Sequence, residues 1–359
     1  MKSPTPRKSI FELVPYKPNF GKSNVKSFIR LSANENPYGF SPKILKKVNN
    51  TDFNRYPLQH NEKLINVIAD RHHLDKNKII LGNGSDELIS ILSQSYLNPG
   101  DEAICTEYGF LQFPQSILIS GGKPVIAKDK NLTVSVKNVL ENVTKKTRLV
   151  FIANPNNPTG TFINKKDVIN LIENLPKNIL LVYDAAYAEY IDEKSYIDGS
   201  ELVEKYNNVI MLRTFSKMHG LAALRLGWGY CSEKILNTLM SVRPPFSVNS
   251  VAVNCGIIAM QDLDFQKKCL EHNKNNMKWI EKELKNLDLD FQRSSANFIL
   301  IKFPIDKKNN TKKAEEYLSK NGILVRSMEI YNLPNHIRLS LGTFEENNFF
   351  IKVLKKFLS

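Results

Sequence analysis

The chain contains few of the residues that mark secreted, membrane-spanning or metal-binding proteins. Its 359 residues include only 4 cysteines and 6 histidines, with no Cys-x-x-Cys pair and only His72 and His73 adjacent. We therefore expect reduced, structural thiols, with no disulfide framework and no metal site. No apolar run approaches the roughly 18 residues of a membrane helix. The first 20 residues show no signal-peptide pattern, so we expect a cytoplasmic protein without a membrane partner.

The charge is strongly basic but is not concentrated in any one segment. Lysine and arginine number 50 against 36 acidic residues, which gives a formal net charge of +14. The lysines come as scattered pairs such as Lys46-Lys47 and Lys312-Lys313. No long basic block and no nucleic-acid-binding motif accompanies them. We therefore expect a solvated, lysine-rich surface and no nucleic-acid partner.

Short apolar runs alternate with helical patterns through the middle of the chain. This alternation predicts an α/β fold with a mostly parallel central sheet. Each run is followed by polar or glycine-rich residues, and in open α/β sheets the ligand crevice lies at the carboxyl ends of the strands. We expect five such ends to converge, after strands predicted at residues 78–81, 102–106, 149–153, 179–183 and 209–212.

The pattern changes near residue 264. A long amphipathic helix is followed by "ANFILIKF", a second helix, "GILVR" and "HIRLSLG", which is typical of a smaller α+β domain. We predict three parts: residues 1–45 as an N-terminal arm and part of the small domain, 46–263 as the large domain, and 264–359 as the C-terminal small domain.

Two of the strand ends suit a phosphate and a planar ring. In "GNGSDELI", Gly84 precedes a predicted helix, with Ser85 or Asp86 as its N-cap. The free N–H groups of a helix start suit a phosphate, although the segment could equally be only a good cap. Tyr108, after the next strand, could stack on a planar ring or simply pack.

The next two strand ends are more specific. "NPNNPTG" forms a rigid turn that holds Asn157, whose amide could donate to a ring oxygen. "VYDAAY" places Asp184 directly after an apolar strand, where a buried carboxylate needs a cationic partner such as a protonated pyridine. Tyr187 lies three residues further on and could share the site. A helix cap is the alternative role for Asp184.

The fifth strand end, "TFSKMHGLAALRLG", joins a lysine to a set of anion-binding side chains. A desolvated lysine amine such as that of Lys217 forms Schiff bases with carbonyls. Hydroxyls and a guanidinium together suit a phosphate, and the segment supplies Thr214, Ser216 and Arg225. An aldehyde, a pyridine nitrogen, a phenolic oxygen and a phosphate are the four groups of pyridoxal phosphate, so the strand ends predict this cofactor.

With these motifs in order, the sequence resembles the fold-type I, aspartate-aminotransferase-like pyridoxal-phosphate enzymes, and within them the histidinol-phosphate aminotransferase family. The resemblance covers nearly the whole chain. It departs from the family pattern at Asn332, where glycine is expected, and at Ala185, where an acid is usual. The motifs that carry it are "LSANENPYG" (31–39), "RYP" (55–57), "GNGSDELI" (82–89), "NPNNPTG" (154–160), "RTFSKMHGLAALRLGWG" (213–229), "RPPFSVNS" (243–250), "ANFIL" (296–300) and "GILVRSMEIYNLPNHIRLSLGT" (322–343).

The resemblance assigns a role to each cofactor residue. It implies that Lys217 is the Schiff-base lysine and that Asp184 keeps the pyridine nitrogen protonated. Tyr108 would stack on the ring, and Tyr56 would reach the site from a second subunit of a homodimer with shared active sites. The ring's 3-hydroxyl oxygen would be held by Asn157 and Tyr187, and the phosphate by Gly84, Ser85, Asp86, Thr214, Ser216 and Arg225.

The resemblance also implies the reaction. Histidinol phosphate and 2-oxoglutarate would be converted to imidazole-acetol phosphate and glutamate, with Lys217 moving the proton. The substrate would be held by Asn157, Arg326, Arg338 and, from the N-terminal arm, Tyr16. An aromatic amino-acid aminotransferase and a threonine-phosphate decarboxylase of the same fold are alternatives. A pyridoxal-phosphate sensor fused to a DNA reader is disfavoured, because only about 30 residues precede "LSANENPYG".

Overall fold

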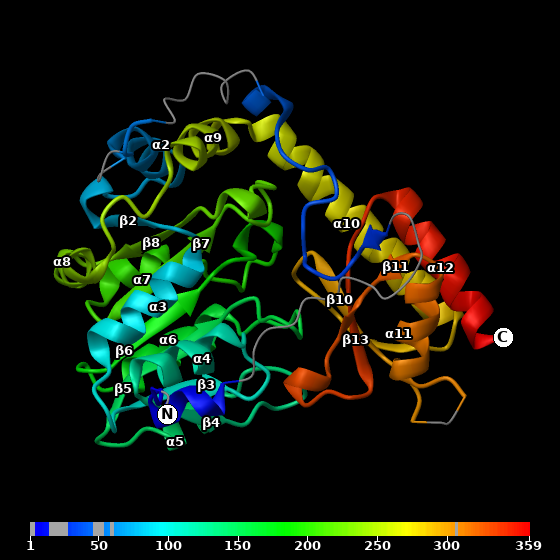
Figure 1. Ribbon diagram of the computed structural model, residues 1–359, viewed down its shortest axis with the longest axis horizontal. Coiled ribbons are helices and arrows are strands. Elements are labelled where there is room, and N and C mark those ends of the chain that lie inside the picture. The colour runs from blue at the N-terminus through cyan, green and yellow to red at the C-terminus, as the bar shows by residue number, and fades with distance from the viewer. Residues whose placement is uncertain (1–3, 14–27, 46–53, 58–60, 306–307) are drawn as a thin grey trace.

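A seven-stranded sheet forms the centre of the larger part of the molecule (Figure 1). The computed structural model describes residues 4–13, 28–45, 54–57, 61–305 and 308–359. The strand order is β2-β8-β7-β6-β5-β3-β4, and β8 alone runs antiparallel to its neighbours. The strands are β2 (Ile79–Gly82), β3 (Glu102–Thr106), β4 (Lys123–Ala127), β5 (Thr147–Ala153), β6 (Leu180–Asp184), β7 (Val209–Thr214) and β8 (Gly227–Cys231). The mostly parallel α/β sheet and its five expected strands are confirmed, and β4 and β8 are additional.

Helices cover both faces of this sheet. In β7, Val209 and Met211 face one apolar core, while Ile210 and Leu212 face the other. Strands that are buried on both faces consist of continuous apolar runs, so they can be predicted from the sequence. The first core is closed by α2 (Glu62–His72), α5 (Val136–Glu141), α6 (Lys165–Asn174), α7 (Ser200–Lys205) and α9 (Ser250–Gln261), and the second by α3 (Ser85–Tyr96), α4 (Gln112–Ser120) and α8 (Glu233–Val242).

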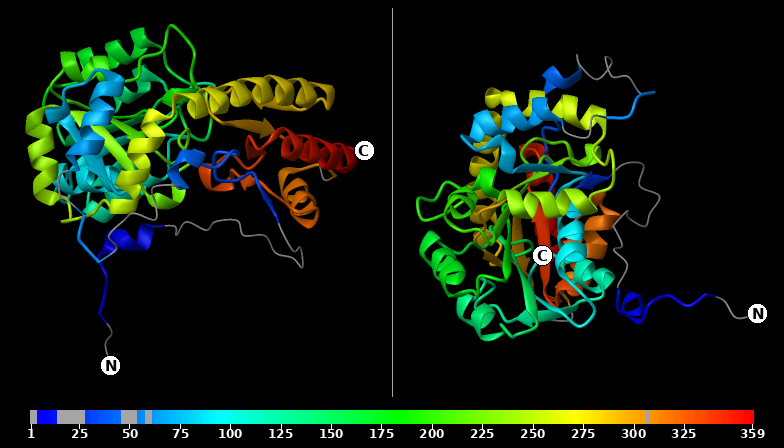
Figure 2. Two further views of the ribbon diagram at one scale, coloured as in Figure 1. Left: turned by 90° about the horizontal axis from the view of Figure 1, so that it is seen from above. Right: turned by 90° about the vertical axis from the view of Figure 1, so that its left-hand side faces the viewer.

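The long helix α10 (Leu263–Asn286) leads from the large sheet to a smaller α+β unit (Figures 1 and 2). Its antiparallel sheet has the order β12-β13-β10-β9. Apolar residues of α10, of the sheet and of the last two helices share a third core. The elements are β9 (Asp290–Gln292), β10 (Phe298–Lys302), α11 (Thr311–Lys320), β11 (Ile323–Leu324), β12 (Arg326–Ser327), β13 (His336–Ser340) and α12 (Phe344–Leu358).

Two N-terminal segments join different parts of the molecule. Strand β1 (Ile29–Arg30) pairs in parallel with β11, so this stretch extends the smaller unit. The 3-10 helix η1 (Lys8–Glu12) packs instead on α4 of the large sheet, where the Arg7 guanidinium donates to the carbonyl of Ile119. The other 3-10 helices are η2 (Pro42–Ile44), η3 (Lys76–Lys78), η4 (Ala188–Tyr190), η5 (Ala222–Leu224) and η6 (Glu329–Tyr331).

All four cysteines are buried free thiols, as expected for structural residues. Across the described ranges, no helix combines the length and apolarity needed to cross a membrane.

Candidate active site

The carboxyl ends of the parallel strands surround a cavity of about 250 Å³. Residues that follow β2, β5, β6 and β7 face each other across it, which confirms that these strand ends converge. The predicted residues that line it are Ser85, Asp86, Asn157, Asp184, Tyr187, Thr214, Ser216, Lys217 and Arg225.

Asp184 is a buried carboxylate with no cation at ion-pair distance among the described residues. It is the last residue of β6, its side chain is 4% exposed, and its Oδ1 accepts the Ala186 N–H at 3.0 Å. Burial raises the pKa of Asp184 to about 7, although the Ala186 N–H and the Lys217 charge oppose this shift. No lysine, arginine or histidine of the described chain forms an ion pair with it. A cation placed in the cavity would stabilise the ionised form.

Lys217 stands on the loop after β7 with its amine in the same cavity. Its Nζ donates to the carbonyl of Ala33 at 3.2 Å and lies 5.9 Å from the centre of the Tyr187 ring. Burial, assisted by the nearby Arg338 charge, lowers the pKa of Lys217 to about 8. A lysine with its pKa lowered toward neutrality is available as a nucleophile and as a base.

Tyr187 is oriented by a residue far away in the sequence. Asn34 donates from Nδ2 to the Tyr187 hydroxyl at 2.9 Å, so the phenolic oxygen is an acceptor in that bond and its own proton can be donated elsewhere. Burial raises the pKa of Tyr187 to about 12, which keeps the hydroxyl neutral. Tyr187 therefore presents a hydrogen-bond donor to an oxygen in the cavity.

Asn157 and Arg338 form one unit at the cavity wall. The Arg338 guanidinium donates from Nη1 to Asn157 Oδ1 at 2.5 Å and from Nη2 to the Ser32 carbonyl at 2.8 Å. With Oδ1 engaged in this way, the Asn157 amide group remains as a donor. Arg326 lies directly opposite Arg338 in the β12–β13 pair, and both side chains are buried. Directly opposite residues share a face of the sheet, so two guanidiniums lie on one face.

The start of α3 forms the anion cradle. The prediction that Ser85 or Asp86 is the N-cap is wrong: Gly84 is the N-cap, at φ +77°, and no side chain caps the helix. A Cβ at Gly84 would lie 2.7 Å from Arg225 Nη2, so glycine leaves room for the Arg225 guanidinium beside the start of α3. Ser85, Thr214, Ser216 and Arg225 surround the cradle. The Asp86 carboxylate pairs with Arg225 Nη2 at 2.7 Å, which leaves its backbone N–H as the group suited to an anion.

Other predicted residues lie away from this cavity. Tyr108 packs against the cluster that contains Leu300 and Met328, and Phe110 is the aromatic residue of that segment in the cavity wall. Tyr56 is 83% exposed, stacks on Phe246 with ring centres 4.8 Å apart, and does not line the cavity of its own chain. Tyr16 lies outside the described residues.

Three residues of "LSANENPYG" belong to the site although no role was predicted for them individually. Ala33 accepts from Lys217, Asn34 orients Tyr187, and Glu35 lines the cavity. The motif was part of the family resemblance, but it gave no sign of the contacts that Ala33 and Asn34 form with residues more than 150 positions away in the chain.

The cavity fits pyridoxal phosphate at three points. The buried Asp184 has no cation at ion-pair distance among the described residues, and a protonated pyridine would provide one. Gly84 lets the Arg225 guanidinium approach the start of α3, where a phosphate would bind. Lys217 offers a reactive amine for the aldehyde. This set, at the carboxyl ends of a mostly parallel sheet, defines a fold-type I pyridoxal-phosphate enzyme.

Comparison with known proteins assigns the family. Residues 26–354 match the model of "Aminotransferase class I and II". The chain is 39% identical to the histidinol-phosphate aminotransferase of Maricaulis maris over 356 residues, and 40% identical to that of Pelagibacter ubique over 360 residues, with 98% of each chain covered in both cases. The chain therefore belongs to the class I and II aminotransferases, and within them to the histidinol-phosphate aminotransferase family. It is a pyridoxal-phosphate-dependent aminotransferase, as the resemblance implied.

A solved structure has the same fold. The crystal structure of histidinol-phosphate aminotransferase from Sinorhizobium meliloti, in complex with pyridoxal-5'-phosphate, superposes with a TM-score of 0.86 at 24% identity, covering 92% of this chain and 91% of that one.

Asp184→Asn should stabilise the cofactor-free protein above neutral pH. The folded pKa of Asp184 is raised to about 7 from an ordinary 3.8, so ionisation opposes folding progressively between these values. In thermal unfolding at pH 8 we expect the variant to melt about 2 °C or more above the parent, and the difference to disappear near pH 4. Added pyridoxal phosphate should stabilise the parent more than the variant. A variant that melts below the parent at pH 8 would contradict this account.

Proposed function

We propose that the chain transfers the amino group of L-histidinol phosphate to 2-oxoglutarate, which gives imidazole-acetol phosphate and glutamate, as a step of histidine biosynthesis. The relatives at 39% and 40% identity carry the name of this activity. The observation that carries the proposal is the pair Arg326 and Arg338, two buried arginines directly opposite each other on adjacent strands, of which Arg338 is hydrogen-bonded to Asn157 in the cavity lining.

The cofactor would be held by the residues that face the cavity. Asp184 would bind the pyridinium nitrogen, and Asn157 and Tyr187 would donate to the 3-hydroxyl oxygen. The phosphate would occupy the cradle at the start of α3, between Thr214, Ser216 and Arg225. When bound, pyridoxal phosphate supplies an electron sink for the negative charge that develops at the substrate α-carbon.

Lys217 carries the proton in this proposal. With its amine free, Lys217 Nζ would remove the proton from the substrate α-carbon as general base and deliver it, as general acid, to the cofactor carbon that carries the aldehyde. A pKa lowered to about 8 leaves part of the Lys217 population unprotonated near neutral pH, as a base requires. The Ala33 carbonyl, 3.2 Å from Nζ, holds the amine at the cavity.

The two arginines distinguish a phosphate from a carboxylate. A carboxylate is largely satisfied by one guanidinium fork, whereas a dianionic phosphate with three acceptor oxygens can use two. Arg338 is fixed by Asn157 and Ser32 and can serve both substrates. Arg326, beside it, would add the second charge for histidinol phosphate. In this proposal Tyr16 would close the pocket from the N-terminal arm.

We also propose a homodimer with shared active sites. In the single chain Tyr56 is 83% exposed and stacks on Phe246, which is itself 43% exposed. Two adjacent exposed aromatic rings suit a surface that is covered by another subunit. Tyr56 would then complete the partner's cavity.

The first expectation is that Lys217 is the amine that binds the cofactor. Borohydride reduction of the yellow holoenzyme followed by peptide mapping should label Lys217, and Lys217→Ala should fail to complete transamination. Lys267→Ala, an exposed lysine on α10, is the matched control and should keep parental activity. Labelling of another lysine would overturn the assignment.

A second expectation separates the two arginines. Arg338→Ala should slow single-turnover reactions with histidinol phosphate and with glutamate alike. Arg326→Ala should slow histidinol phosphate more, by roughly 10- to 100-fold in kcat/KM, as expected for the loss of one charged hydrogen bond. The exposed Arg293→Ala serves as the control. If Arg326→Ala slowed both donors equally, or spared histidinol phosphate, the aromatic aminotransferase would become the better assignment.

A third expectation tests the shared site. Inactive Lys217→Ala chains refolded together with defective Tyr56→Ala chains should recover part of the parental activity, because one site of each hybrid dimer has both residues intact. Activity is measured on hybrids isolated with two different affinity tags. Hybrid dimers without recovered activity would show that Tyr56 serves its own subunit.

A further inference from the structure

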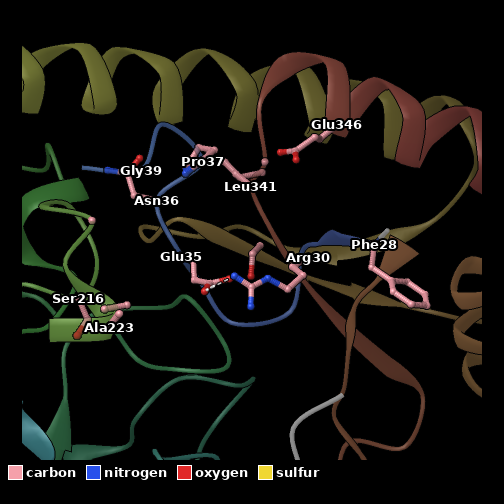
Figure 3. A pocket seen from close by; sticks show the side chains of 14 residues that line it. Phe28, Arg30, Glu35, Asn36, Pro37, Gly39, Ser216, Ala223, Leu341 and Glu346 are labelled. Atoms are coloured by element: carbon pink, nitrogen blue, oxygen red, sulfur yellow. Dashed lines mark hydrogen bonds and ion pairs between the residues drawn. The ribbon is translucent and has the colours of Figure 1, made fainter. Parts of the chain in front are cut away.

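Glu35 lies where the cofactor cavity meets a second, outer pocket. The outer pocket has a volume of about 380 Å³ and shares Glu35, Ser216 and Ala222 with the cofactor cavity. Its wall is formed by the segment that follows β1, by the loop after Lys217 and by the start of α12 (Figure 3). A substituent on the substrate α-carbon that extends from the inner cavity toward the outer pocket would therefore pass Glu35.

The backbone around Glu35 is firmly held. Its neighbours Asn34 and Asn36 are 1% and 9% exposed. Asn297 donates from Nδ2 to the carbonyl of Asn34 at 3.0 Å, and Asn36 donates to the carbonyl of Met218 at 2.7 Å. Because these contacts already hold the backbone, the segment loses little backbone entropy when its side chains bind a ligand.

The Glu35 carboxylate is only partly engaged. Its Oε1 accepts from Arg30 Nη2 at 3.2 Å, and the two side chains are 36% and 68% exposed (Figure 3). Glu35 also lines the cofactor cavity together with Lys217. Glu35 is therefore an anionic acceptor close to the amine and open to the outer pocket.

The other carboxylates around the two pockets have different tasks. Asp86 pairs with Arg225 at 2.7 Å. Glu346 accepts the Thr343 N–H at 2.8 Å as part of the capping box of α12. Asp184 lies at the cofactor end of the cavity. Among the acidic residues that line the two pockets, Glu35 is the one placed to meet a substrate side chain.

We infer that Glu35 accepts a hydrogen bond from the imidazole N–H of the substrate and thereby selects histidinol phosphate over phenylalanine. The inference rests on the proposed function. The arrangement of charges supports it, because the dianionic phosphate goes to Arg326 and Arg338 while the side chain that can donate, or carry positive charge, meets the carboxylate. Neutral imidazole has one N–H donor and imidazolium has two, whereas a phenyl ring has none.

The test compares Glu35→Met, which removes the acceptor at similar length, with Glu35→Gln, which keeps an oxygen acceptor without the charge. Holoenzyme kinetics are measured with histidinol phosphate, phenylalanine and glutamate as amine donors. We expect Glu35→Met to lose roughly 10- to 100-fold in kcat/KM for histidinol phosphate, with phenylalanine changed less than about threefold. Glu35→Gln should lose less. Glu271→Met, an exposed carboxylate on α10, is the control variant.

A binding measurement separates recognition from catalysis. Calorimetric titration of the holoenzyme in its pyridoxamine-phosphate form, which does not react with an amine donor, should show weaker binding of histidinol phosphate to Glu35→Met than to the parent, with no such difference for phenylalanine. Equal losses for both donors, or an unchanged ratio of their kcat/KM values, would overturn the role of Glu35 while leaving the proposed function intact. A parent enzyme that turns over phenylalanine but not histidinol phosphate would overturn the proposed function itself.

Discussion

The buried carboxylate of Asp184 sets the requirements for the rest of the site. A charge at the end of a strand whose two faces are both covered is unfavourable unless a cation meets it, and the protein chain provides none at ion-pair distance within its described part. The site is therefore electrostatically incomplete without a cationic ring. Burial has the opposite effect on the basic Lys217 and lowers its pKa to about 8. Burial in one cavity thus moves the pKa values of both groups toward neutrality.

A buried arginine links the two segments that carry these groups. Arg213, 4% exposed and next to Thr214 in β7, donates to Glu189 and to Asp198, each at 3.0 Å. Glu189 belongs to η4, which follows the Asp184–Tyr187 segment directly. The guanidinium therefore ties the strand that leads to Lys217 to the segment that leads from Asp184. A buried guanidinium is costly to leave unpaired, so these two ion pairs favour one arrangement of the two strand ends.

The strands whose ends form the site could be predicted from the sequence, but β4 and β8, which lie beside them in the sheet, could not. Fully buried strands such as β7 are continuous apolar runs and are easily predicted. β4 is an edge strand, exposed along much of its length and with Pro124 inside it, so its apolar run is short. β8 contains Gly227, where a Cβ would lie 2.3 Å from the Ser85 N. The close approach of β8 to the start of α3 requires glycine, and glycine removes the strand signal from the sequence.

The contacts that complete the site could not be predicted because the residues that form them are distant in the chain. Nothing near Asn34 indicates that its amide will meet Tyr187, and nothing near Arg338 indicates that it will bind Ser32 and Asn157. These contacts cross from the smaller unit, or from the segment after β1, to the large sheet. The proposed cofactor groups thus come from one sheet, and the proposed substrate groups Arg326, Arg338 and Glu35 come from the smaller unit and from the segment after β1. If these roles hold, the site can change substrate preference at the second set while the strand ends that would hold the cofactor stay unaltered.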